Sequence, residues 1–306
     1  MPTRLPPAEK LPLAVRKNIR DEWDAKKADL EKNLSEALGT EWTIEADPLA
    51  IYPYATSDWG KNSIGSVLHQ YFSSAIDYLK DFANKHGEQG VSEINTLIPA
   101  HAITMDFDEA GANTYCGCDI TDGKLRILFS ETYLGTNISD AVGYYTFEKA
   151  LNKAEQAEDA TLNFFARKGI REVEPEIEKL TKEVQTILNN ENLKLNPNWV
   201  AVFDKLKSSK MDRDDWDSNL GSFLKYYFEG LVSQLKYQKF DGDDMLQEGF
   251  NEVVEKGEIA FRVVDKLEKS NYNECVIEDG VLYLQTVPNY FGTNASDAAT
   301  GLLDLL

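Results

Sequence analysis

Two segments of the chain, 157 residues apart, carry closely similar sequences. Residues 113–141 read NTYCGCDITDGKLRILFSETYLGTNISDA, and residues 270–298 read SNYNECVIEDGVLYLQTVPNYFGTNASDA. Aligned without a gap, 13 of the 29 positions are identical. A repeat of this length predicts two copies of one domain-sized unit, because a solenoid needs at least three short repeats.

The similarity continues upstream in the same order. Trp42 has its counterpart in Trp199, and the pair Asp58-Trp59 has its counterpart in Asp215-Trp216. We therefore expect a tandem duplication that covers most of the chain. The expected divisions are a flexible N-terminal arm at 1–14, a first unit at 15–157, a helical connector at 158–174 and a second unit at 175–306.

Hydrophobic periodicity predicts the first elements of each unit. After each Asp-Trp pair, apolar residues recur at helical spacing. Earlier in the chain, Gly39 is typical of the end of a helix. The expected pairs of elements are helices near 15–38 and 175–189, strands at 42–46 and 199–203, helices near 64–79 and 220–231, and weaker helices at 91–97 and 243–256.

The repeated segments predict the rest of the sheet. Strands are expected at 102–107 and 259–264, and each is followed by a hairpin whose turn is Asp-Gly, because glycine readily adopts the positive φ of a tight turn. A last helix is expected to begin near Ser139 and near Ser296, with the serine as N-cap. The unit is therefore predicted to be α+β, in the order α-β-α-(α)-β-β-β-α, with mainly antiparallel sheets and helices packed on one face.

The balance of charge limits the classes of partner. The chain has 52 acidic and 32 basic residues, a net charge of −20, with the excess spread over both halves. Nucleic acid and an anionic membrane surface both need clustered basic residues, so neither is an expected partner. A protein partner, and a basic one in particular, is compatible with this charge. The absence of an 18-residue apolar run and of an apolar leader, together with only three cysteines, favours a cytoplasmic protein.

No motif in the sequence predicts catalysis, a metal or a cofactor. Cys116 and Cys118 lack further ligands for a metal site, and only Cys118 recurs, as Cys275. None of the three histidines recurs in the second copy. Asp106-x-Asp108 resembles the start of a calcium loop, but Gly117 stands where the bidentate glutamate would be needed.

The candidate binding residues are those that recur in polar loops. Exposed tryptophan beside aspartate is typical of protein-binding hot spots. The candidates are Asp58, Trp59, Tyr133 and Asn137 in the first unit, and Asp215, Trp216, Tyr290 and Asn294 in the second. They favour a non-catalytic interaction protein, such as an adaptor, an inhibitor or an immunity-type binder, with two related surfaces. The alternatives are a small-molecule-binding protein or enzyme with its site in a cleft between the units, and a structural component of a larger assembly.

Overall fold

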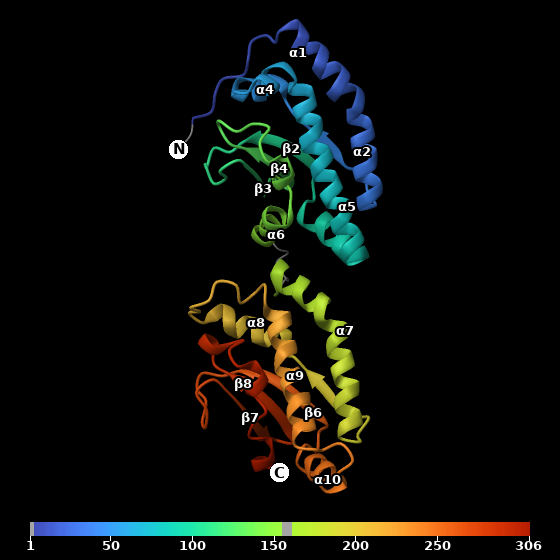
Figure 1. The fold of residues 1–306 in the computed structure, drawn as a ribbon, viewed down its shortest axis with the longest axis vertical. Coiled ribbons are helices and arrows are strands. Elements are labelled where there is room, and N and C mark those ends of the chain that lie inside the picture. Colours follow the sequence, from blue (N-terminus) through green and yellow to red (C-terminus); the bar gives the residue numbers. More distant parts are fainter. Residues whose placement is uncertain (1–2, 155–160) are drawn as a thin grey trace. The chain divides into compact units, whose positions relative to one another are not determined.

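The computed structural model of the chain describes residues 3–154 and 161–306. The chain divides at residue 157 into two compact units (Figure 1). Each unit has its own four-stranded sheet and its own helices. The expected boundary at 157 and the first residues of the expected connector lie outside the described residues.

Both units contain a mixed sheet with the same strand order. In unit one the order is β1-β2-β4-β3, and in unit two it is β5-β6-β8-β7. The strands of unit one are β1 (Thr43–Glu45), β2 (Ala102–Phe107), β3 (Cys116–Thr121) and β4 (Lys124–Phe129). Those of unit two are β5 (Lys194–Asn196), β6 (Glu258–Val263), β7 (Asn273–Glu278) and β8 (Val281–Thr286).

The α+β class is confirmed, but the expectation of mainly antiparallel sheets is wrong. In each sheet the first three strands in spatial order pair in parallel, and only the hairpin pairs, β3 with β4 and β7 with β8, are antiparallel. The physical reason is the length of the connections. A two-residue turn requires antiparallel strands, whereas helices separate β1 from β2 and allow a parallel crossover.

The helices of unit one begin with a nearly continuous helical run over the expected 15–38. Gly39 ends it with φ 68°, a left-handed conformation that favours glycine. Gly87, at φ 61°, interrupts the longest helix, so the expected helix at 91–97 is the final part of that same element. The helical segments are α1 (Leu13–Asn18), a π-helical turn (Ile19–Asp24), α2 (Ala25–Leu38), α3 (Pro48–Ile51), a 3-10 turn (Tyr52–Tyr54), α4 (Asp58–Asn62), α5 (Ile64–Leu97) and α6 (Tyr144–Lys153).

Unit two corrects one expected strand. Residues 199–203 are helical, because Trp199, Val202, Phe203 and Leu206 share one face of a helix. The strand that pairs with β6 lies just before them, at 194–196. The α-helices are α7 (Phe164–Ile187), α8 (Trp199–Ser208), α9 (Leu220–Tyr237) and α10 (Asp244–Val253). Helix α7 is continuous through position 175, so residues 164–174 of the expected connector and the first helix expected in unit two form one element.

The Gly-Thr-Asn motif does not start an α-helix with a serine cap. It leads into one 3-10 turn in each unit, η3 (Ile138–Asp140) and η5 (Ala295–Asp297). Asn137 and Asn294 precede these turns with positive φ, 51° and 49°, which asparagine tolerates better than most residues. In unit one the α-helix α6 follows η3. In unit two the 3-10 segment η4 (Pro288–Tyr290) precedes η5, and the 3-10 segment η6 (Leu302–Leu305) follows it.

Long helices and the sheet share one core in each unit. In unit two, α7 packs on α9, and Tyr227 of α9 contacts Phe261 of β6 with ring centroids 4.4 Å apart. In unit one, α2 packs on α5, whose Tyr71 and Phe72 are fully buried. Burial of these large side chains is the main favourable contribution to folding of each unit. Among the described residues, no helix combines the length and apolar character needed to span a membrane.

The N-terminal residues 3–12 lack regular structure but contact unit one. Arg4 forms hydrogen-bonded ion pairs with Asp106, at 2.8 Å, and with Glu109. The backbone N–H of Leu5 donates to the hydroxyl of Tyr54 at 2.7 Å. These contacts join residues of the expected N-terminal arm to unit one.

Candidate functional site

Two pairs of exposed tyrosines occupy matching positions in the two units. Tyr115 directly precedes β3 and meets Tyr133 edge to face, with ring centroids 5.1 Å apart at 68°. Tyr272 and Tyr290 make the same contact in unit two, at 4.8 Å and 68°. All four side chains are 40–45% exposed. Each pair therefore presents aromatic surface to solvent in a fixed geometry.

A buried tyrosine anchors the loop that carries one tyrosine of each pair, Tyr133 or Tyr290. The hydroxyl of Tyr71 accepts a hydrogen bond from the backbone N–H of Gly135 at 3.1 Å, and Tyr227 does the same for Gly292 at 3.1 Å. Burial raises the pKa of Tyr227 to about 12, so its hydroxyl is neutral at physiological pH. The tyrosine-bearing loops are thus attached to the cores by equivalent bonds.

The asparagines of the repeated motif contribute their backbone. The thiol of Cys116 donates to the carbonyl oxygen of Asn137 at 3.1 Å. In unit two the side-chain amide of Asn273 donates to the carbonyl oxygen of Asn294 at 2.9 Å. The equivalent carbonyl groups of Asn137 and Asn294 are therefore bonded by different residue types. Both asparagines have a left-handed backbone conformation, which asparagine adopts more readily than most residues.

Trp59 lies beside the tyrosine pair of unit one. Its ring packs so closely on Gly135 that a Cβ at this position would stand 2.7 Å from Cζ3 of the indole. The hydroxyl of Thr56 donates to the carbonyl oxygen of Thr132 at 3.0 Å and links the same two segments. Trp59 is 39% exposed. Trp59, Tyr115 and Tyr133 thus form one surface, which we call the aromatic surface of unit one.

Trp216 does not take the corresponding place in unit two. Its ring packs on Phe203 of α8, with centroids 5.1 Å apart. Phe223 takes the position beside Gly292, and the guanidinium of Arg213 lies 4.6 Å from the centre of the Phe223 ring. Phe223, Tyr272 and Tyr290 form the aromatic surface of unit two.

The two aspartates of the Asp-Trp pairs also differ. Asp58 is an exposed residue in the first turn of α4. The carboxylate of Asp215 accepts hydrogen bonds from Arg213 at 2.6 Å and from the side-chain amide of Asn219 at 3.0 Å. In unit one Trp59 therefore packs on Gly135 in the loop that carries Tyr133, whereas in unit two Phe223, and not Trp216, lies beside Gly292 in the loop that carries Tyr290.

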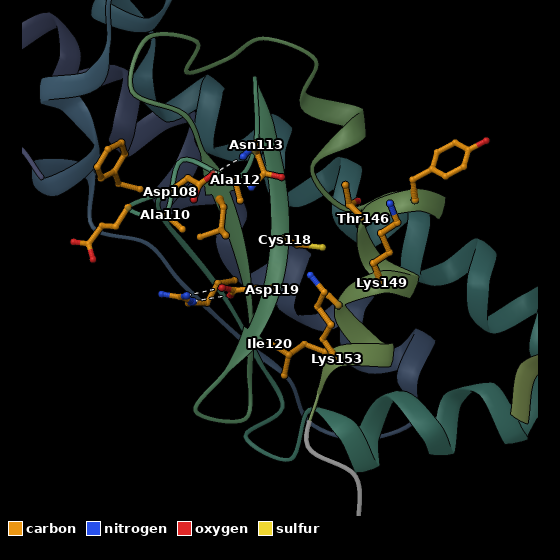
Figure 2. A pocket seen from close by; sticks show the side chains of 16 residues that line it. Asp108, Ala110, Ala112, Asn113, Cys118, Asp119, Ile120, Thr146, Lys149 and Lys153 are labelled. Carbon is orange, nitrogen blue, oxygen red and sulfur yellow. Dashed lines mark hydrogen bonds and ion pairs between the residues drawn. The ribbon is translucent and has the colours of Figure 1, made fainter. Parts of the chain in front are cut away.

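A cavity of about 720 Å³ runs beside β3 in unit one (Figure 2). It lies between β3, the loop after β2 and helix α6. The carboxylate of Asp108 accepts from the backbone and side-chain amides of Asn113 and holds that loop closed. Arg126 forms a bidentate pair with Asp119 at 2.8 and 2.6 Å. These bonds shape the walls of the cavity.

Two lysines on α6, Lys149 and Lys153, line this cavity. Lys149 and Lys153 are exposed, and no ion pair or hydrogen bond joins either of them to another residue within 3–154 and 161–306. The thiol of Cys118 lies opposite α6, and burial raises its pKa to about 12. Burial also raises the pKa of Cys116 to about 12 and that of Cys275 to about 11, which leaves all three thiols protonated and poorly nucleophilic at neutral pH.

The sequence pattern missed several of these residues. Tyr115 and Tyr272 align as an identical pair in the repeat, and this identity is the sequence feature that could have marked them as candidate binding residues. At the offset of 157 residues, Lys149 aligns with Leu306 and Lys153 aligns with no residue of the sequence, so the repeat does not highlight either lysine. Among the described residues, no cluster of three or more histidine, cysteine, aspartate or glutamate side chains could hold a metal ion. No protein-family model, curated protein or solved structure matches this chain.

Proposed function

We propose that the protein is a non-catalytic interaction protein whose units each present an aromatic surface to a protein partner. The observation that carries the proposal is the pair of exposed, edge-to-face tyrosines found at the same place in both units. Tyrosine and tryptophan are enriched among the residues that dominate binding energy at interfaces. Adaptor, inhibitor and immunity-type roles all need such surfaces.

The proposal includes a tandem duplication of the unit. Its support is the common strand order, the common tyrosine-to-glycine anchor and the sequence identity of the repeated segments. Duplication would give one chain two related surfaces, and two linked contacts bind more tightly than either one alone when the partner can reach both.

The rigidity of the tyrosine loops supports binding over a merely structural role. The buried hydroxyls of Tyr71 and Tyr227 fix the loops before any partner arrives. A surface that is already ordered loses less conformational entropy on association. The four exposed rings also retain a hydroxyl that can bond to a partner while the ring is buried.

The partner that best fits these surfaces is basic. The chain has a net charge of −20, and an exposed carboxylate, Asp58, stands next to Trp59. Arginine stacks on aromatic rings and pairs with carboxylates, so both groups would recognise it. The contact of Arg213 with Phe223 is an example of this chemistry within the chain. The three free cysteines support a reducing, cytoplasmic setting as part of the same proposal.

Affinity capture from the native source tests this proposal. Tyr133→Ser combined with Tyr290→Ser should lower recovery of bound protein about tenfold or more, because each removes an interface ring. The control is Tyr226→Ser combined with Tyr237→Ser, which alters two exposed tyrosines of α9 that are outside both aromatic surfaces. Unchanged recovery with the first variant, at equal folding by circular dichroism, would contradict the proposal.

A further inference from the structure

Strand β3 is a free edge of the sheet of unit one. The turn Asp122-Gly123 has positive φ at both residues, 53° and 69°, as in a two-residue type I′ hairpin. In such a hairpin the flanking residues, Thr121 and Lys124, form a hydrogen-bonded pair, and every second pair along the ladder does the same. The bond from the N–H of Ser130 to the carbonyl oxygen of Tyr115 fits this alternation.

This alternation determines which backbone groups point outward. The N–H and C=O groups of Cys116, Cys118 and Ile120 face away from β4. No backbone hydrogen bond to any of these groups is present in the part of the chain that the structure describes. An open edge of this kind is a template for an added strand.

The cavity of about 720 Å³ lies along this edge and faces helix α6. Figure 2 shows α6 running beside β3, with Lys153 reaching from the helix toward the strand and Lys149 one turn earlier. The other charged groups of the lining have partners: Asp119 pairs with Arg126, Glu109 pairs with Arg4, and Asp108 accepts two hydrogen bonds from Asn113. The two lysines are therefore the charges available to a ligand.

The spacing of the lysines matches that of an extended chain. Four residues of α-helix advance about 6 Å. Two residues of a β-strand advance about 6.6–6.8 Å. Acidic side chains at positions i and i+2 of a strand added to β3 would point to the same side and lie opposite Lys149 and Lys153.

We infer that the groove between β3 and α6 binds an extended segment of a partner protein with the pattern acid-x-acid, by strand addition to β3. The backbone of the segment bonds to the outward groups of Cys116, Cys118 and Ile120, and its two carboxylates pair with Lys149 and Lys153. This site is separate from the aromatic surfaces, and neither proposal depends on the other.

The corresponding cavity of unit two is a less suitable site for the acidic segment. A second copy of the chain is a less suitable occupant of the groove in unit one. The cavity beside β7, of about 440 Å³, is lined by Glu274, Asp297 and Asp304, with one lysine, Lys269. Acidic side chains would be repelled there. A second copy of the chain is disfavoured at the β3 edge because each copy has a net charge of −20.

Fluorescence anisotropy with a labelled peptide, Thr-Glu-Val-Glu-Val-Thr, and the full chain tests the inference. Lys149→Gln combined with Lys153→Gln should weaken binding about fivefold to tenfold, the effect of two exposed ion pairs. The control, Lys179→Gln combined with Lys182→Gln, makes the same charge change on exposed residues of α7 and should leave affinity unchanged. Equal weakening by both variants would overturn the inference, since the effect would then be one of net charge.

A second peptide separates strand addition from charge attraction. N-methylation of alternate peptide bonds on its pairing edge removes the backbone donors and should abolish binding. Amide hydrogen exchange should show new protection at Cys116, Cys118 and Ile120 with the unmodified peptide. The inference fails if the methylated peptide binds equally well, or if these amides are already protected in a dimer of the chain alone.

Discussion

At the scale of single residues, each unit has a buried tyrosine, Tyr71 or Tyr227, whose hydroxyl bonds to a loop. The two hydroxyls differ in their hydrogen-bond partners. Tyr71 accepts one hydrogen bond, from Gly135. Tyr227 accepts the bond from Gly292 and also donates to Oδ1 of Asn273 at 3.0 Å. Cys116 stands in the place of Asn273, and a thiol is a weak donor that bonds the loop carbonyl directly. The two anchors therefore differ in the number of partners that depend on the hydroxyl.

Removal of these hydroxyls should test that difference. Tyr227→Phe should lower the free energy of unfolding by about 1–3 kcal/mol, because it leaves the part-buried N–H of Gly292 and the buried amide oxygen of Asn273 without a partner. Tyr71→Phe should cost less, since only the N–H of Gly135 loses its acceptor. Urea denaturation measures both, with Tyr226→Phe as an exposed control that should change little. An equal loss in both variants would argue against this account of the anchors.

At the scale of elements, the N-terminal segment and β2 are joined by opposite charges. Burial alone would raise the pKa of Asp106, but the hydrogen bond from Arg4 and that from the N–H of Phe107 outweigh it and lower the pKa below its ordinary 3.8. A carboxylate with a lowered pKa in the folded state contributes stability at pH values above the unfolded pKa. That contribution is lost as the pH falls through the folded pKa.

Replacement of Arg4 should therefore have a pH-dependent effect. Arg4→Met should lower the free energy of unfolding at pH 7 by about 1 kcal/mol or less, since the pair is partly exposed. The difference from wild type should shrink as the pH falls below about 4, because Asp106 is protonated in the variant and in the unfolded chains before it is protonated in folded wild type. Urea denaturation at pH 7, 5 and 3.5 measures this. A difference that grows toward low pH would show that Arg4 acts through something other than Asp106.

At the scale of the whole molecule, the dominant property is the excess of negative charge. A net charge of −20 destabilises a compact state through self-repulsion. Salt weakens that repulsion, because the Debye length falls from about 30 Å at 0.01 M to about 8 Å at 0.15 M ionic strength.

Thermal stability should accordingly rise with salt. The midpoint of unfolding, measured by calorimetry at pH 7, should increase between about 0.01 M and 0.15 M NaCl and then level off as screening saturates. Sucrose, which stabilises by exclusion from the surface without adding charge, serves as the comparison. A midpoint that stays constant or falls over this range of NaCl would show that favourable ion pairs outweigh the net repulsion.

Much of the local structure follows from residues close together in the chain. Asp122-Gly123 and Asp279-Gly280 form the turns that their sequence predicts, because positive φ at a two-residue turn is a local requirement. The apolar stripes that begin at Ile64 and Leu220 form α5 and α9 for a similar reason, since helical spacing is set over a few residues. The prediction of a strand at 199–203 was wrong because five residues are too few to distinguish the helical period of about 3.6 residues from the strand period of two.

Only the tertiary structure decided how these elements meet. The parallel pairing of β2 with β4, the packing of Trp59 on Gly135 and the different packing of Trp216 depend on contacts between distant residues. Lys149 and Lys153 line the groove because the fold places α6 beside β3. The sequence by itself determined the turns, the helical stripes and the charge, because these rest on neighbouring residues or on composition. The surfaces proposed for binding required the fold, because residues far apart in the chain build them.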